Sequence, residues 1–500
     1  MEINFDKRAV NVFKEISYQT KVIQEICETV VPDTDEDIGS LAAVQSSVLL
    51  KSKDLTSRGV LITGEACASV MYVNEAQDKV SYLKLKRAFS MEYDLAESSA
   101  DIASQINLRI VSAEARLINP RKVSVCFEIE GELSCFVTDD LVVEYGIPKD
   151  SCAGIHAKYE NTELNVVSYV CEKTFSLSEQ LAFPTGKPTP VKIVSADAGI
   201  VINDTQTVGT KVIVKGTAEI AVNYLSDEVN YPVKTEFTAA FSQIIDIGDK
   251  SVESCNIAPA ITGIYFNLAD SIAGEKILDL ELHAVLQLVC RSKCTLAYIS
   301  DAYSNLMPAV CSREKSSISH VVDYKKIKAA TDERINISED CADVLSVFVC
   351  MSHFKQLLEG ITANVNMDII YRNTGGFIES VRRSVKLECE CPAQSFRVNS
   401  ARLADLYLRP DGQFVECHIA LEMACLVYSE IEIDRLVSVS LDEDGQIDFD
   451  KYPTVSLVRC SGESVWELAK TYHSSVERIT ESNDMDTDLK GKMILVPKCI

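Results

Sequence analysis

Hydrophobic and polar residues alternate with a period of two along several long stretches of the chain. The clearest stretch has apolar side chains at Val123, Val125, Phe127 and Ile129. Two further stretches alternate in the same way, at Leu278, Leu280, Leu282, Ala284 and Leu286, and at Val415, Cys417, Ile419, Leu421 and Met423. This period predicts β-strands that are half buried, with one face packed and the other open to solvent or to a neighbour.

The alternating stretches recur along the chain, with a period of about 150 residues. An extended segment opens each repeat, at 17–32, 168–184 and, more faintly, 319–338. A second block, at 59–73, 211–225 and 359–372, is interpreted as two strands around a polar turn. A third block, at 109–137, 260–290 and 396–428, reads as strand, turn and strand. Turn residues such as Asn119-Pro120-Arg121 support that reading.

The last fifty residues break the repeat and predict a separate module. They suggest a strand, two short helices and a closing strand at 493–497. Ser464 with Glu467, and Ser474 with Glu477, fit the Ser-x-x-Glu capping box that begins a helix. The fold is therefore predicted to be mainly β: three related, sandwich-like β-rich domains in tandem and a small βααβ domain. The predicted limits are 1–150, 151–305, 306–445 and 452–500.

The C-terminal module resembles a LysM domain. The resemblance rests on the segment Ser461–Trp466, on Asn483 and on the pattern from Leu489 to Pro497. It implies a shallow groove that binds N-acetylglucosamine polymers in most members. The groove residues that it implies are Gly462, Glu463, Ser464, Val465, Ile479, Asn483, Asp484 and Met485. Trp466, in step with Ala469, is interpreted as a core residue of the module rather than as a platform for sugars.

Repeated β-rich domains followed by one LysM module resemble the SipL-like family of spore-coat morphogenetic proteins and, more distantly, the SpoVID-like spore envelope proteins. The resemblance implies a place in the mother-cell cytoplasm, at the forespore surface. It also implies that the LysM module binds the morphogenetic ATPase of the spore coat rather than glycan.

Composition narrows the possible partners. The formal net charge is −25, so phosphate backbones and anionic lipid surfaces would repel the chain, and nucleic acid is not an expected partner. Charged residues interrupt the first apolar stretch before a signal peptide could form, and no window has the length of a membrane span. A cytoplasmic location is expected, in which the 18 cysteines act mainly as small buried side chains.

The sequence shows no arrangement of residues that predicts catalysis. No nucleophile with its base, phosphate loop or paired metal knuckle stands out, so no catalytic, cofactor or metal residues are assigned. The prediction is a non-enzymatic adaptor in spore envelope assembly, with self-association left open. The alternative is a protein that binds peptidoglycan through the LysM groove. The binding surfaces of the repeats remain open.

Overall fold

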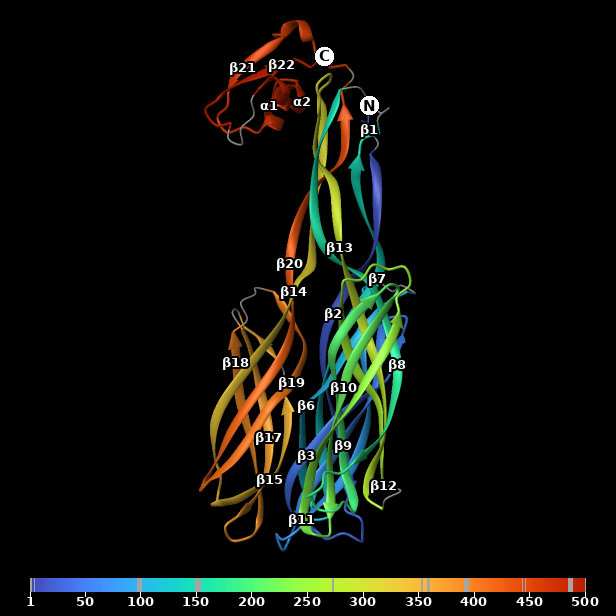
Figure 1. Cartoon of the computed structure of the whole chain (residues 1–500), viewed down its shortest axis with the longest axis vertical. Helices are drawn as coiled ribbons and strands as arrows, with labels where there is room; N and C mark the ends of the chain where they lie inside the picture. Colours follow the sequence, from blue (N-terminus) through green and yellow to red (C-terminus); the bar gives the residue numbers. More distant parts are fainter. Residues whose placement is uncertain are drawn as a thin grey trace.

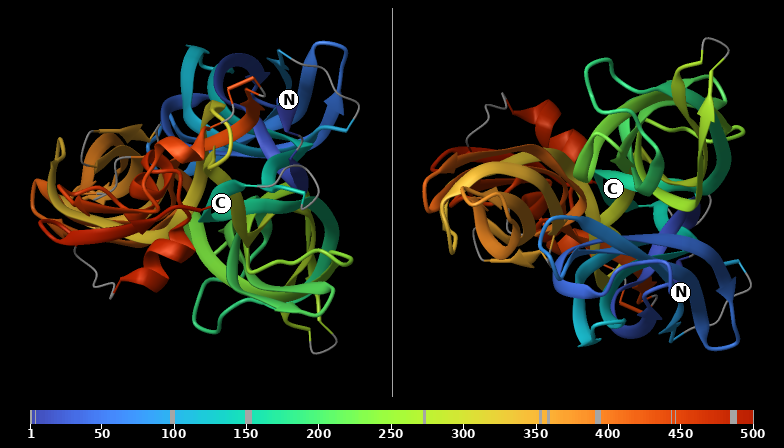
Figure 2. Two further views of the ribbon diagram at one scale, coloured as in Figure 1. Left: turned by 90° about the horizontal axis from the view of Figure 1, so that it is seen from above. Right: turned by 90° about the horizontal axis from the view of Figure 1, so that it is seen from below.

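A computed structural model describes residues 2–3, 5–96, 101–148, 154–271, 274–351, 354–357, 360–390, 395–442, 444–445, 447–483 and 489–499. The chain is mainly β, as the alternation predicts, and its strands are long (Figure 1). The domain limits given above stay predictions. The strands themselves fall into three groups that surround a common axis (Figure 2).

Each group contains two antiparallel sets of three paired strands connected in the same order, and the pair Phe13–Val167 joins one set of the first group to one set of the second in a six-stranded sheet. The first group comprises β2 (Asp6–Val30), β3 (Ile38–Leu55), β4 (Gly59–Asn74), β5 (Val80–Asp94), β6 (Ala103–Asn119) and β7 (Lys122–Gly146), paired as β2-β7-β6 and β3-β4-β5. The second comprises β8 (Ile155–Ala182), β9 (Lys192–Val208), β10 (Lys211–Ser226), β11 (Val229–Asp246), β12 (Ser254–Asp270) and β13 (Lys276–Ser304), paired as β8-β13-β12 and β9-β10-β11.

The third group repeats this order with one short additional strand. It comprises β14 (Ala309–Asn336), β15 (Cys341–Met351), β16 (Lys355–Gln356), β17 (Gly360–Asn373), β18 (Ile378–Glu390), β19 (Phe396–Asp411) and β20 (Phe414–Leu441). Its sheets are β14-β20-β19 and β15-β17-β18, with β16 also on β17. The short strand β1 (Glu2–Ile3) pairs with β20, so the start of the chain lies on the third group.

The register of the longest hairpins is the same in all three groups. A β-bulge follows the pairs Glu15–Phe136, Val167–Arg291 and Val321–Tyr428. A second bulge, on the opposite strand, follows the pairs Lys7–Glu144, Tyr159–Ile299 and Arg313–Leu436. Both strands of each hairpin therefore advance eight residues between the bulges. Because a bulge shifts register and bends a strand, this match shows that the hairpins are built alike.

The apolar faces predicted from the sequence are buried. Val123, Phe127 and Ile129 are all 0% exposed, and the predicted rows on β13 and β20 are at most 2% exposed. In the first group the two sheets share one apolar core, which includes Ile62 of β4 and Phe127 of β7. The turn at 119–121 also lies where it was expected, between β6 and β7.

The second block of each repeat was predicted wrongly, because it forms one strand rather than two. β4, β10 and β17 each run straight through the expected turn. A polar turn was expected there, but Gly64 and Gly216 lie within continuous strands and leave space for an aromatic ring on the neighbouring strand. A Cβ atom on Gly216 would lie 2.4 Å from the Phe241 ring, and one on Gly64 would lie 2.3 Å from the Phe89 ring.

Beyond the two-sheet bodies, the three long hairpins continue together as a stalk (Figure 1). We define the stalk as residues 6–15 with 136–146, 155–167 with 291–304, and 309–321 with 428–441. Its apolar core draws on all three groups, through Val143, Leu164, Leu296, Tyr298 and Ile433. The stalk therefore holds the three groups together and carries the C-terminal module at its far end (Figure 1).

Candidate functional site

The C-terminal module consists of two short helices and a two-stranded antiparallel sheet. Its elements are β21 (Val455–Arg459), α1 (Val465–Thr471), α2 (Val476–Ser482) and β22 (Met493–Pro497), and a single turn of 3-10 helix, Phe449–Lys451, precedes them. Buried Leu468, Ala469 and Ile479 of the helices pack against Ile494 and Val496 of β22. The helices thus cover one face of the small sheet.

The two predicted helix caps have different outcomes. At α1 the capping box is present, because Ser464 accepts from the backbone of Glu467 and the Glu467 carboxylate accepts from the backbone of Ser464. At α2 the prediction was wrong by one residue. The N-cap is Ser475, which accepts from the backbone N–H of Arg478 at 3.2 Å, whereas the Ser474 hydroxyl donates to the carbonyl of Pro497.

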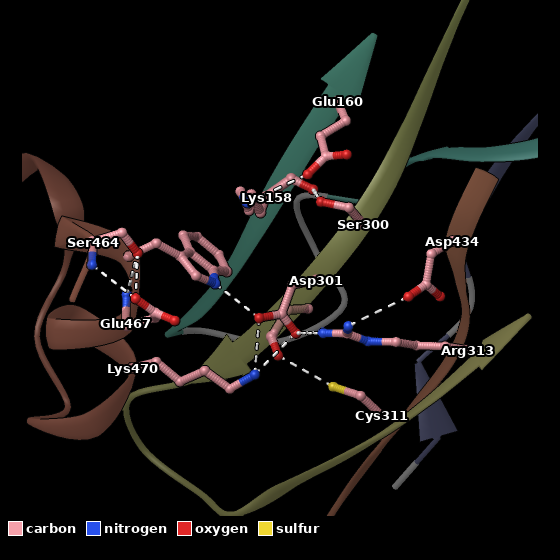
Figure 3. A network of polar contacts seen from close by, with 12 residues as sticks. Lys158, Glu160, Ser300, Asp301, Cys311, Arg313, Asp434, Ser464, Glu467 and Lys470 are labelled. Atoms are coloured by element: carbon pink, nitrogen blue, oxygen red, sulfur yellow. Dashed lines mark hydrogen bonds and ion pairs between the residues drawn. The ribbon is translucent and has the colours of Figure 1, made fainter. Parts of the chain in front are cut away.

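The module is attached to the stalk through a polar contact that we call the joint, centred on Asp301 of β13 (Figure 3). The Trp466 indole N–H donates to Asp301 Oδ2 at 2.8 Å, and Lys470 Nζ lies 2.9 Å from both carboxylate oxygens. Arg313 of β14 adds an ion pair at 2.8 Å. One carboxylate from the second group therefore connects the third group to the module.

The charge of Asp301 depends on these partners. Burial by itself raises the pKa of a carboxyl group, but the hydrogen bonds from Trp466, Lys470 and Arg313 outweigh it, so the pKa of Asp301 lies below its usual value. Its side chain is 12% exposed. Asp301 is therefore ionised at neutral pH, and the joint is a charge-assisted contact.

An aromatic contact completes the joint. The Tyr303 ring meets the Trp466 ring edge-on, with centroids 4.9 Å apart, and the Tyr303 hydroxyl donates to the carbonyl of Ser474 at 2.8 Å. Tyr303 is 3% exposed and belongs to the same buried cluster as Leu468. Trp466, predicted as a core residue, packs against the module core and also bonds outside the module, to the stalk.

The first half of the predicted groove is an exposed turn before α1. Gly462 has a φ of 132°, a conformation that favours glycine, and Glu463 beside it is exposed. Glu463 accepts a hydrogen bond from the Ser461 backbone at 2.6 Å. Ser464 is used in the helix cap, and Val465 is half buried against the module core. This turn is open to solvent while the joint is formed.

The second half of the predicted groove is used largely for structure. The Ile479 side chain is 0% exposed and lies in the core. The Asn483 amide donates to the carbonyls of Ile479 and Leu495 and accepts from the Leu495 backbone, all within 2.8 Å. Asn483 thus ties the end of α2 to β22. Asp484 and Met485 lie outside the described residues.

The outer face of the small sheet is apolar, and the sequence analysis did not anticipate it. Leu457 pairs with Leu495, and Arg459 pairs with Met493. Four side chains are exposed on this face, at 49%, 60%, 52% and 41%: Val455, Leu457, Met493 and Leu495. We call these residues the outer apolar face. Adjacent exposed apolar side chains mark interaction surfaces more often than single ones do.

No group of three or more His, Cys, Asp and Glu side chains among the described residues is placed to hold a metal ion. In the same residues, no helix has the length and apolar character needed to cross a membrane.

The fold and the joint define a class of chain: repeated all-β groups on a shared stalk, with a small helical module at its end. Comparison with known families adds a more specific similarity. The family model described as "SipL, SPOCS domain" matches residues 191–269, which span β9 to β11 and nearly all of β12. The match points to a sporulation-related protein, and SipL is not a known enzyme family. No curated protein and no solved structure matches the chain.

The sequence analysis missed Asp301 and Tyr303, which the structure places at the joint. One local signal was present, since Asp301 is the only charged residue in the segment from Leu296 to Tyr303. An acidic residue in such a position needs partners. Those partners lie 165 and 169 residues further along the chain, so the sequence alone could not identify them.

Proposed function

We propose that this chain is a non-enzymatic adaptor in spore envelope assembly, whose C-terminal module is a LysM domain that docks a partner protein. The similarity of residues 191–269 to the SipL SPOCS domain supports the sporulation setting. By the resemblance of the whole arrangement, the partner is the morphogenetic ATPase of the spore coat. The stalk and the repeated bodies hold that module at one end of a long frame (Figure 1).

The proposal that the module docks a protein rests on the outer apolar face. It is exposed although it lies on a module whose other face is already packed by helices. Burying four apolar side chains against a partner supplies the non-directional part of a protein interface. Val455 and Leu457 contribute from β21, and Met493 and Leu495 from β22.

The polar groups of the module argue against sugar as the main ligand. Sugar binding uses free hydrogen-bonding side chains and an exposed aromatic ring. Asn483 has all three of its described hydrogen bonds inside the module. Trp466, the only tryptophan of the chain, donates its N–H to Asp301 of the stalk. Protein docking therefore fits this module better than peptidoglycan binding.

The test compares the full chain with a double variant, Leu457→Ser with Leu495→Ser. Both positions are exposed, so the fold should tolerate the change. We expect weaker binding to the purified coat ATPase by calorimetry, and loss of a fluorescent ring around the forespore in sporulating cells. Ile118→Ser, at an exposed position on β6 that is 49% accessible, is the matched control.

A parallel sedimentation assay with purified peptidoglycan tests the alternative. Retention of the full chain that is lost when Gly462–Val465 is altered, together with unchanged ATPase binding by the double variant, would replace the adaptor with a wall-binding protein. If the full chain binds neither the ATPase nor peptidoglycan, both roles for the module are rejected.

A further inference from the structure

A cavity of about 700 Å³ lies at the base of the stalk, where the three long hairpins separate into the bodies. Residues from all three groups line it. Its apolar wall includes Phe13, Val167, Leu296 and Ile433. The volume falls in the range of small-molecule sites, which are mostly apolar with a few placed polar groups.

Two arginines line this cavity, and their surroundings differ. Arg397 is fully partnered: it bonds Glu15 at 2.7 Å, and its guanidinium lies over the Tyr18 and Tyr428 rings at 4.0 and 4.7 Å from their centroids. Arg291 is only 6% exposed, and its side chain has no hydrogen-bond or ion-pair partner in the described part of the chain.

The Arg291 guanidinium faces the cavity, because the residue lines it and, among the residues that the structure describes, none of its nitrogens is a fully enclosed atom without a hydrogen bond; the burial of the residue still disfavours its charge. Burial lowers the pKa of Arg291, and the electrostatic influence of Tyr428 and Glu15 opposes that change. Glu15 already forms its ion pair with Arg397. A buried cation without a counter-ion costs several kcal/mol in general, and arginine does not deprotonate in proteins. An anionic group beside the Arg291 guanidinium would therefore stabilise its charge.

The remaining charged residues of the wall do not supply that anion, because each has its own partner. Glu132 bonds Arg109 at 3.0 Å, and Asp139 lies 3.8 Å from Lys14. Asp140 accepts from Asn11 at 3.2 Å. Arg435 pairs with two carboxylates, Glu144 at 3.0 Å and Glu314 at 2.8 Å.

A second polar atom in the cavity also lacks a partner. Asn256 is 6% exposed, lines the cavity, and its Oδ1 atom has no hydrogen bond among the described residues. This oxygen is enclosed by the protein itself, so it adds polarity to the wall of the cavity but is not open to a ligand.

We infer that this cavity binds a small amphipathic anion, with a carboxylate or phosphate head on Arg291 and an apolar body against the wall. The guanidinium offers two parallel N–H donors, which match the two oxygens of such a head. The site is separate from the C-terminal module and adds a small-molecule ligand to the adaptor.

The test uses the full chain and three eight-carbon probes, octanoate, 1-octanol and octylammonium, with binding measured by calorimetry. We expect octanoate to bind more tightly than octanol, and octylammonium least. Octyl phosphate in place of octanoate distinguishes a phosphate head from a carboxylate head. Equal affinity for the three probes, or no binding of any anion, would overturn the inference without any variant.

The variant Arg291→Gln sharpens the test. It should bind octanoate about 10-fold to 100-fold more weakly, the loss expected when a hydrogen bond to a charged group is removed. Its affinity for octanol should not change. Arg116→Gln is the matched control, since the Arg116 side chain is 81% exposed on β6. Octanoate binding by Arg291→Gln at the affinity of the unaltered chain would place the anion elsewhere and contradict the inference.

Discussion

In the first body Phe127 lies fully buried among apolar side chains of two sheets, whereas at the joint Asp301 lies among a tryptophan N–H, a lysine and an arginine. The hydrophobic effect is non-directional, so many buried side chains together stabilise the fold of a body. The polar half of the joint depends on one carboxylate, beside the Tyr303 contact. The difference implies that one substitution can weaken docking of the module while the bodies remain folded.

The largest effect is expected in a body. Phe127→Ala removes a ring that is 0% exposed and should lower the free energy of unfolding by about 3–5 kcal/mol, because it leaves a cavity. Urea denaturation followed by circular dichroism measures this. The emission of Trp466 before the transition should not change, since the joint is far along the stalk.

A smaller but more selective effect is expected at the joint. Asp301→Asn removes the charge that Lys470 and Arg313 share and should weaken docking of the module by about 1.5–3 kcal/mol. Because Trp466 is the only tryptophan, its fluorescence reports docking directly, and we expect a red shift. Asp279→Asn, at an exposed position on the same strand, is the control. Unchanged emission in Asp301→Asn would contradict the joint.

The same contact should depend on pH. The pKa of Asp301 is lowered in the folded state, so its contribution is complete above the unfolded pKa of about 3.9 and is lost as the pH falls through the folded value. Acid titration of the Trp466 emission should therefore show a step below pH 4 in the unaltered chain that Asp301→Asn lacks.

A third test compares two bodies at equivalent positions. Gly216 of β10 lies against the Phe241 ring, while Ala363 occupies the corresponding place on β17, eight residues before a buried tyrosine in both strands. Gly216→Ala should cost about 1–3 kcal/mol through overpacking. Ala363→Gly should cost less, about 0.5–1 kcal/mol. Thermal unfolding of both variants decides whether glycine is required only beside phenylalanine.

The smallest effect is expected at the second helix of the module. Ser475→Ala removes the N-cap and should destabilise α2 by about 1 kcal/mol. Amide exchange at Arg478 should accelerate. In Ser474→Ala the same amide should keep its protection, because that hydroxyl bonds Pro497 rather than the helix end. The reverse pattern would restore the cap that the sequence suggested.

The alternation of residues was sufficient to predict β7, β13 and β20 and their buried faces. The segment from Val123 to Ile129 shows why. Successive side chains of a strand point to opposite faces, so apolar residues at every second position identify the packed face. This pattern does not state what the face packs against. Gly64 illustrates the failure, since its meaning depends on Phe89, a residue of another strand. A lone glycine within a strand pattern fits both a turn and a close contact.

The module was easier to predict than its attachment. The capping box at Ser464 and Glu467 is local, so four residues specify it. The joint is a contact between residues more than 160 positions apart, and no local pattern pairs Asp301 with Lys470. The outer apolar face was missed because single exposed leucines in short strands look like core residues until the helices are placed.

The matching bulges show that three similar hairpins, each with its own sequence, are joined within one chain. A trimer of identical subunits would place the same residue three times around its axis and would come apart on dilution. Here all three hairpins belong to one polypeptide, so their assembly is independent of concentration. The equivalent position beside the first bulge also holds a different residue in each hairpin: Phe136, Arg291 and Tyr428. One chain can therefore place a single cation at this position, whereas three identical copies would place three cations that repel one another.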